Sequence, residues 1–174
     1  MRKKLLKRES PRPWWRDWLC FARDWLISVP KLSRENFISI SILMNLVGGI
    51  VVDTCVWIDY FRREPLPLVE KGLQEGKILL SPIVGAELIA GIRHPKELRE
   101  LEFFLQDLEP VDCGFDHWMR TGKLKHFLAS KGLTVTLPDV HIAQLAIENE
   151  AKIYSFDKIF SKIASVISLQ LISR

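Results

Sequence analysis

The chain has 174 residues, of which 48% are hydrophobic and 26% charged, so it is long enough for one globular domain with an extension. Its three cysteines, Cys20, Cys55 and Cys113, are odd in number and far apart, which argues against a disulfide framework or a CxxC zinc motif and favours a reducing cytoplasm. The net charge of +4 arises at the N-terminus, because residues 1–48 hold ten Lys/Arg against four Asp/Glu, whereas residues 49–174 hold fifteen against seventeen.

Residues 1–45 form a basic, Trp-rich N-terminal extension that differs from the rest of the chain. Such a segment suits an arm that binds nucleic acid through phosphate contacts and stacking, or a helix that lies on a membrane surface. A signal peptide and a stable membrane span are not expected, because the apolar run Phe37–Val52 starts too late for the first and is shorter than the roughly 20 residues needed for the second. Since synthesis could begin at Met44, the sequence leaves open whether the extension is native, and it predicts the working domain over residues 46–174.

From residue 49 onward, short apolar runs alternate with helical stretches, which predicts an α/β fold with a central, mostly parallel sheet. The predicted strands are Ile50–Asp53, Lys77–Leu80, Lys152–Ser155 and Val166–Ile172, with short β-prone segments at Val111 and Thr134–Thr136. The predicted helices are Val56–Phe61, Leu66–Glu75, Ile83–Ile92, Lys96–Leu108, Phe115–Lys131, Asp139–Glu150 and Lys158–Ala164.

Three acidic residues end or follow predicted strands or β-prone segments and precede or open helices: Asp53, Asp139 and Asp157. Each one alone is explained by helix N-capping, for which Asp is among the best residues. Together they suggest more, because ligand sites of open parallel sheets lie at the carboxyl ends of the strands. Carboxylates gathered there repel one another unless one takes up a proton or a cation joins them.

Glu87 is the fourth acidic candidate, within the predicted apolar helix Ile83–Ile92. Its neighbours at helical spacing offer no polar partner, so the sequence predicts that its carboxylate lies on an apolar face. A buried, unpaired carboxylate would normally take up a proton. A divalent metal site made of oxygen ligands from all four acidic residues is the simplest common explanation.

With these residues in place, the chain resembles the PIN-domain family and, within it, the VapC-type toxin ribonucleases of type II toxin–antitoxin systems. The resemblance covers about residues 46–174 and implies a PIN-like three-layer α/β/α fold. Each matching stretch is weak alone, but the four occur in the family's order and spacing. They are Ile50–Phe61, Leu80–Leu88, Gly132–Ala143 and Ile153–Phe160.

The resemblance implies a metal-dependent endoribonuclease that uses Mg²⁺ or Mn²⁺ to hydrolyse RNA. Asp53 and Asp139 would be the principal metal ligands, completed by Glu87 and Asp157. Family membership also implies a cognate antitoxin protein and a homodimer.

Two small hydroxyl residues, Thr54 and Ser155, would orient ligands or phosphate beside the metal. Two positions depart from the family pattern: Cys55 replaces a usual Ser or Asn, and His141 replaces an apolar residue. We expect the thiol to be tolerated and His141 to face the substrate or the helix surface.

Three other classes of protein compete with this interpretation. A cysteine-dependent phosphatase using Cys55 and Arg62 fails on their spacing, and a haloacid-dehalogenase-type phosphatase needs an Asp where Cys55 stands. A non-catalytic PIN-fold module that binds RNA or protein remains open, although this chain keeps all four carboxylates. Basic residues expected to draw RNA to the rim are Arg62, Arg63 and Arg93.

Overall fold

The computed structural model describes residues 49–62, 66–108 and 110–172, so the N-terminal extension and Arg63 lie outside the described residues. The strands are β1 (Ile50–Val52), β2 (Ile78–Leu79), β3 (Lys152–Tyr154) and β4 (Gln170–Ile172). The helices are α3 (Thr54–Arg62), α4 (Pro67–Gln74), α5 (Pro82–Gly91), α6 (Pro95–Asp107), α7 (Phe115–Ser130), α8 (Leu137–Glu148) and α9 (Lys158–Ala164). None of the helices in these ranges has the length and apolarity needed to span a membrane.

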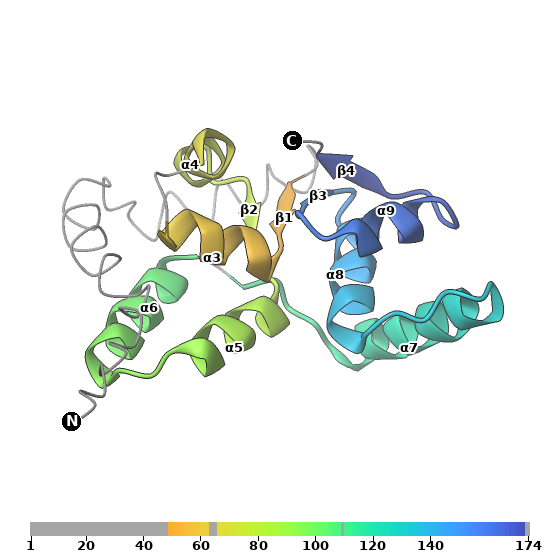
Figure 1. Cartoon of the computed structure of the whole chain (residues 1–174), viewed down its shortest axis with the longest axis horizontal. Coiled ribbons are helices and arrows are strands. Elements are labelled where there is room, and N and C mark those ends of the chain that lie inside the picture. The colour runs from red at the N-terminus through yellow and green to blue at the C-terminus, as the bar shows by residue number, and fades with distance from the viewer. Residues whose placement is uncertain (1–48, 63–65, 109, 173–174) are drawn as a thin grey trace, which may run out of the picture.

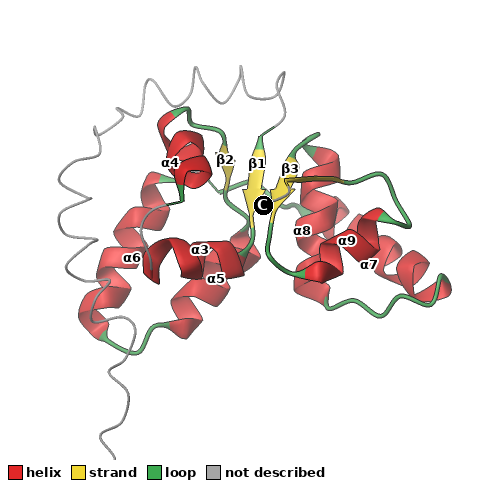
Figure 2. Ribbon diagram, turned by 45° about the horizontal axis from the view of Figure 1, so that its top comes forward, coloured by secondary structure: helices red, strands yellow, loops and turns green. Residues whose placement is uncertain are grey.

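The four strands form one sheet in the order β2-β1-β3-β4, and all three pairings are parallel. The predicted "mostly parallel" sheet is therefore wholly parallel over the described strands. In the central pair, Val52 lies opposite Tyr154, so β1 and β3 end side by side. Helices α3–α6 and helices α7–α9 form two groups, and the carboxyl end of β1 points between them (Figures 1 and 2).

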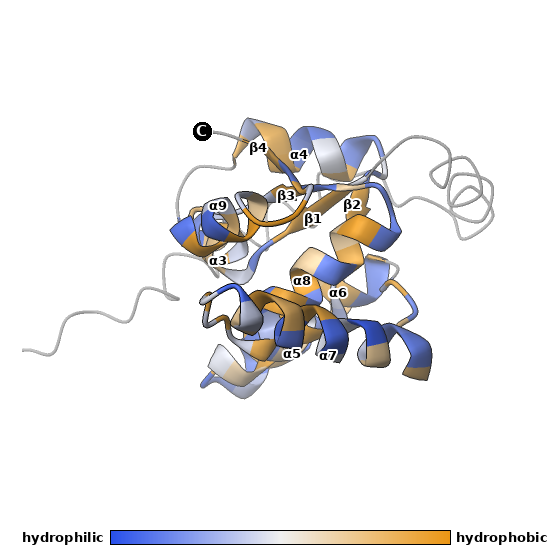
Figure 3. Ribbon diagram, turned by 90° about the vertical axis from the view of Figure 1, so that its right-hand side faces the viewer, coloured by the Kyte–Doolittle hydropathy of each residue, from blue (hydrophilic) through white to orange (hydrophobic). Residues whose placement is uncertain are grey.

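The fold has three layers, with helices on both sides of the sheet as the sequence predicts. Helices α3 and α9 lie on one side of the strands, whereas α6 and α8 lie on the other (Figure 3). Helix α8 contacts both β1 and β3, and α7 packs along α8. The run Val140–Ala146 of α8 is buried throughout, as expected for a helix enclosed by the sheet and neighbouring helices.

Local sequence signals explain where the helices begin and end. A proline occupies the first turn of α4, α5, α6 and α8, where its missing N–H costs no hydrogen bond. Gly76 and Gly132 follow α4 and α7 with φ of 61° and 79°, a conformation that favours glycine. Apolar side chains fill the space between sheet and helices, with Val51, Trp57 and Ile153 fully enclosed.

Two β-prone segments and one strand differ from the prediction. Thr134–Thr136 is neither helix nor strand in the described chain, so Asp139 does not follow a strand. The expected strand at Val111 is reduced to one bridge between Leu80 and Pro110, where proline cannot donate to a ladder. The last strand covers only Gln170–Ile172 of the predicted Val166–Ile172.

Candidate functional site

Asp53 lies at the centre of the acidic group, directly after β1. Its backbone N–H donates to the Tyr154 carbonyl at 3.0 Å, which continues the β1–β3 ladder and fixes the start of its side chain. The residue is 8% exposed. Its Oδ1 accepts a hydrogen bond from the Thr54 N–H at 2.7 Å, and its Oδ2 accepts from Ser155 Oγ at 2.6 Å and from the Cys55 thiol at 3.1 Å. These donors hold the carboxylate in one orientation.

Ser155 connects the ends of β1 and β3. Its hydroxyl donates to Asp53 and accepts the backbone N–H of Asp157 at 2.9 Å. Asp157 is the N-cap of α9, because its Oδ1 accepts the Ile159 N–H at 2.8 Å. Asp157 therefore caps α9 and also belongs to the acidic group, because the cap uses only Oδ1 and not Oδ2.

Glu87 corrects the sequence prediction, because its side chain is neither buried nor without a partner. It is exposed on α5, and its Oε2 accepts a hydrogen bond from Thr54 Oγ1 at 2.5 Å. Helical spacing along α5 alone gave no sign of this partner, which comes from α3 packed against α5. Thr54 thus joins two carboxylates, since its backbone N–H donates to Asp53 and its hydroxyl to Glu87.

Asp139 lies in the first turn of α8 and is not its N-cap. Thr136 caps the helix, accepting the Asp139 N–H at 3.4 Å and donating its hydroxyl to Asp139 Oδ2 at 2.5 Å. This reciprocal pair resembles a capping box and fixes the side chain. Burial raises the pKa of Asp139, and the negative charges of Asp53 and Asp157 raise it further, while the Thr136 hydrogen bond opposes the shift.

The arrangement suits a hard divalent cation. The donor set consists of carboxylate and hydroxyl oxygens, which Mg²⁺ and Mn²⁺ prefer over nitrogen or sulfur. Within the described part of the chain, no three of these carboxylates bring oxygens within 4.8 Å of one another. That spacing fits Mg²⁺, which keeps several waters and usually contacts only one or two carboxylates directly.

Cys55 is not suited to act as a nucleophile beside Asp53. Burial raises the pKa of its thiol to about 11, and its hydrogen bond to Asp53 adds to the increase. Nucleophilic cysteines instead depend on a lowered pKa that yields a thiolate at neutral pH. The thiol therefore serves as a neutral donor to Asp53, which argues against the cysteine-phosphatase alternative.

Two of the expected rim arginines lie on the surface. Arg62 is the last residue of α3, and Arg93 lies between α5 and α6. Both side chains are exposed.

A hydrogen-bonded row of side chains, formed by Ser81, His141, His117 and Glu148, was not predicted from the sequence. His141 is wholly enclosed, contrary to the expected surface or substrate-facing position. Its Nε2 is 3.1 Å from Ser81 Oγ, and its Nδ1 is 2.8 Å from His117 Nε2. His117 Nδ1 in turn lies 2.8 Å from Glu148 Oε2. Ser81 stands at the N-cap position of α5, but its side chain makes no cap hydrogen bond, and its hydroxyl contacts His141 instead.

The surroundings of this row of side chains strongly lower the pKa values of His141 and Glu148. Burial lowers the pKa of His141 to about 4, and the neighbouring His117 contributes to the decrease. Burial opposes ionisation of Glu148, but hydrogen bonds from Arg120, His117 and Gln144 outweigh it and lower its pKa to about 2. The sequence signals this group only through the spacing of Cys113 and His117, which are four residues apart. Cys113 lies before α7 and His117 lies within it.

Comparison with known proteins supplies a family and a fold. A family model described as "PIN domain" matches residues 50–166. No curated protein matches the chain in a sequence comparison.

Three solved structures share the fold. A chain of DNA-bound VapBC from Salmonella typhimurium superposes with a TM-score of 0.61 at 24% identity, covering 72% of this chain and 98% of that chain. A chain of VapBC2 from Rickettsia felis, bound to a promoter DNA fragment, gives a TM-score of 0.58 at 24% identity, covering 71% of this chain and 96% of that chain. A chain of FitAcB from Neisseria gonorrhoeae gives a TM-score of 0.55 at 18% identity, again covering 71% of this chain and 96% of that chain.

Proposed function

This chain belongs to the PIN-domain family, and from that premise we propose that it is a metal-dependent endoribonuclease. The observation that carries the proposal is the connected acidic group at the carboxyl end of the sheet. Asp53 is bound to Ser155 and Thr54, Thr54 to Glu87, and Ser155 to the Asp157 backbone, while Asp139 is coupled to Asp53 and Asp157 through charge. Helix capping accounts for Asp157 and Asp139 singly, but it does not account for four carboxylates from separate segments in one group.

Asp53 and Asp139 are the residues that would hold Mg²⁺ or Mn²⁺, with Glu87 and Asp157 binding its waters. When bound, the metal would supply charge neutralisation at the scissile phosphate and lower the pKa of a water. One carboxylate of this group would accept a proton from the attacking water, whose oxygen bonds to phosphorus as the phosphodiester P–O bond breaks. The leaving oxygen takes up a proton, which balances the hydrolysis.

Thr54 and Ser155 would act by positioning rather than by chemistry. Ser155 donates to the Asp53 oxygen that also accepts from Cys55, so it fixes the direction of the remaining lone pairs. Thr54 fixes Asp53 and Glu87 relative to each other across α3 and α5. Preorganised ligands of this kind require little rearrangement on metal binding.

RNA is the proposed substrate, with the phosphate backbone drawn in by basic side chains. Arg62 and Arg93 are exposed and suited to backbone contacts, and Arg63 is proposed to join them from outside the described residues. Residues 46–174 would make up the catalytic domain, acting in the cytoplasm.

We further propose that the protein is the toxin of a toxin–antitoxin pair and forms a homodimer. Support comes from the fold similarity to chains of VapBC, VapBC2 and FitAcB. A protein partner is also consistent with the large apolar side chains that α7 leaves exposed, Phe115, Met119 and Phe127. A cognate antitoxin would inhibit cleavage by covering the acidic group.

The deciding experiment is an RNA-cleavage assay on the full purified chain with Mg²⁺, Mn²⁺ or a chelator. We expect internal cleavage of a labelled RNA with either metal and none with the chelator. Cleavage that persists in the chelator would refute metal dependence. RNA binding without cleavage in either metal would instead support the alternative, a non-catalytic PIN-fold binding module, which the wide spacing of the carboxylates would then explain.

A further inference from the structure

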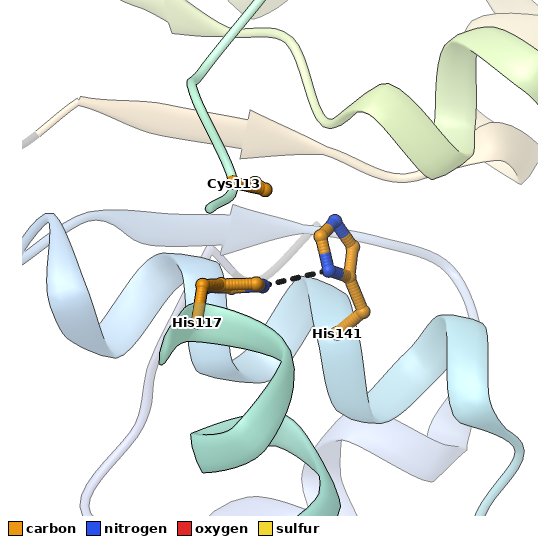
Figure 4. A group of neighbouring side chains, drawn as sticks. All are labelled: Cys113, His117 and His141. Atoms are coloured by element: carbon orange, nitrogen blue, oxygen red, sulfur yellow. Dashed lines mark hydrogen bonds between the residues drawn. The ribbon is translucent and has the colours of Figure 1, made fainter. Parts of the chain in front are cut away.

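A second group of metal-binding side chains lies apart from the acidic residues. Cys113, His117 and His141 each bring one ligand atom to a common point, and the three atoms lie within 4.8 Å of one another. They come from the segment before α7, from the first turn of α7 and from α8, and their side chains converge (Figure 4). We propose that these three residues bind a zinc-class transition-metal ion, which links α7 and the preceding segment to α8.

The donor atoms distinguish this site from the acidic one. One thiol and two imidazoles suit Zn²⁺, whereas Mg²⁺ and Mn²⁺ prefer oxygen ligands. Three protein ligands leave a fourth tetrahedral position for water. The two sites would therefore select different ions from the same solution.

The distance between the two imidazoles is close to what a shared ion needs. His117 Nε2 and His141 Nδ1 are 2.8 Å apart, joined by one shared proton. Two nitrogens bound to tetrahedral zinc at ~2.0–2.1 Å stand about 3.3 Å apart. Replacing the proton by the ion thus requires the rings to separate by about half an ångström, which side-chain rotation can supply.

The outer nitrogen of each ring is held as in established zinc sites. His117 Nδ1 bonds to Glu148 Oε2 at 2.8 Å, and His141 Nε2 bonds to Ser81 Oγ at 3.1 Å. A carboxylate on the far nitrogen fixes the tautomer and makes the near nitrogen a better ligand. Glu148 is itself fixed, since Arg120 Nε and Gln144 Nε2 donate to its other oxygen at 2.5 and 2.7 Å.

Burial and access are also compatible with metal binding. His117 and His141 are 3% and 0% exposed, and the Trp118 ring stacks on His141 at 4.7 Å with an interplanar angle of 14°. Cys113 is only partly buried, so an ion can enter from its side. Burial, with the charges of Glu148 and Asp112, raises the pKa of the Cys113 thiol. An entering metal would therefore displace a proton from the thiol as it binds.

The test is to add Co²⁺ and, separately, Zn²⁺ to the metal-free full chain. We expect one equivalent of Co²⁺ to produce a thiolate-to-cobalt charge-transfer band and intense tetrahedral d–d bands, and Zn²⁺ to displace it and raise Tm. Cys113→Ser should abolish the charge-transfer band. Glu148→Gln, which changes a positioning residue, should weaken Zn²⁺ affinity roughly 10–100-fold while the spectrum keeps its shape.

Matched variants separate this site from other sources of signal. Cys55→Ser should retain the band, which excludes a thiolate beside Asp53, and Asp53→Asn should retain the zinc stoichiometry. His126→Gln alters an exposed histidine of the same helix α7 and should bind Zn²⁺ like the parent. The proposal is overturned if the metal-free chain gives no charge-transfer band, or if Cys113→Ser, folded by circular dichroism, binds Co²⁺ and Zn²⁺ as the parent does.

Discussion

Replacing Asp53 with asparagine tests the acidic site most directly, because it removes one charge at a nearly buried position with little change in volume. The asparagine carbonyl oxygen can still accept from the Thr54 N–H, but its NH₂ group would face Ser155 and Cys55. The Ser155 hydroxyl would then lose a charged acceptor. A hydrogen bond to a charged group contributes about 1.5–3 kcal/mol to the free energy of unfolding.

The loss is offset by relief of repulsion. The charge of Asp53 raises the pKa of Asp139, so removing it stabilises the Asp139 carboxylate. We therefore expect the free energy of unfolding of the metal-free protein to change by no more than about 2 kcal/mol. Cleavage should fall far more, by at least about 10²–10³-fold, which corresponds to roughly 3–4 kcal/mol of transition-state stabilisation.

The assay is single-turnover cleavage of a labelled RNA in Mg²⁺, with urea unfolding of each variant measured in parallel. Asp107→Asn is the matched control, because it makes the same chemical change at an exposed position at the end of α6. It should cleave at the parent's rate. An Asp53→Asn variant that cleaves as fast as Asp107→Asn would refute the assignment of Asp53 as a metal ligand.

Three further outcomes are expected. Cys55→Ser should cleave RNA at a rate close to the parent's, because a thiol with a pKa of about 11 is protonated at neutral pH. A loss of cleavage rate as large as that of Asp53→Asn would instead assign a catalytic role to Cys55. Glu148, with a folded-state pKa lowered to about 2, stabilises the fold above its unfolded pKa, so stability should be lost as pH falls from about 5 to about 2 in the parent; because the residue is exposed and its charge is screened by solvent, we expect a loss of about 1 kcal/mol in the free energy of unfolding. Urea titrations should show that this acid-dependent part is absent in Glu148→Gln. The raised pKa of Asp139 acts in the opposite sense, so the stability of the metal-free parent should fall as pH rises from the unfolded towards the folded pKa; in Asp139→Asn that fall should be missing, and cleavage should be lost.

The strands and helices could be predicted well because their signals are local. The β-branched run of β1, the prolines at helix starts and the glycines at helix ends each act within a few residues. The parallel order also follows from alternation of strands and helices. The prediction for Thr134–Thr136 was wrong because a β-prone segment forms a strand only if the edge of a neighbouring strand is available to pair with it.

Side-chain partners across the fold could not be predicted in the same way. Glu87 looked unpaired because Thr54 lies 33 residues earlier, on another helix. His141 looked like a surface residue because Ser81 and His117, its hydrogen-bond partners, lie 60 and 24 residues away. The cysteine and histidine spacing likewise gave no zinc pattern, since one of the three donors comes from a different helix.

The bond between Ser155 and Asp53 joins residues 102 positions apart, and β1 borders β3 in the middle of the sheet. During translation, Asp53 leaves the ribosome long before Lys152–Tyr154 can pair with the strand that precedes it. Non-local pairing of this kind forms late. A nascent chain would therefore carry Asp53 and Glu87 without Asp139, Ser155 and Asp157, so the proposed nuclease would not cleave its own mRNA until synthesis is almost complete.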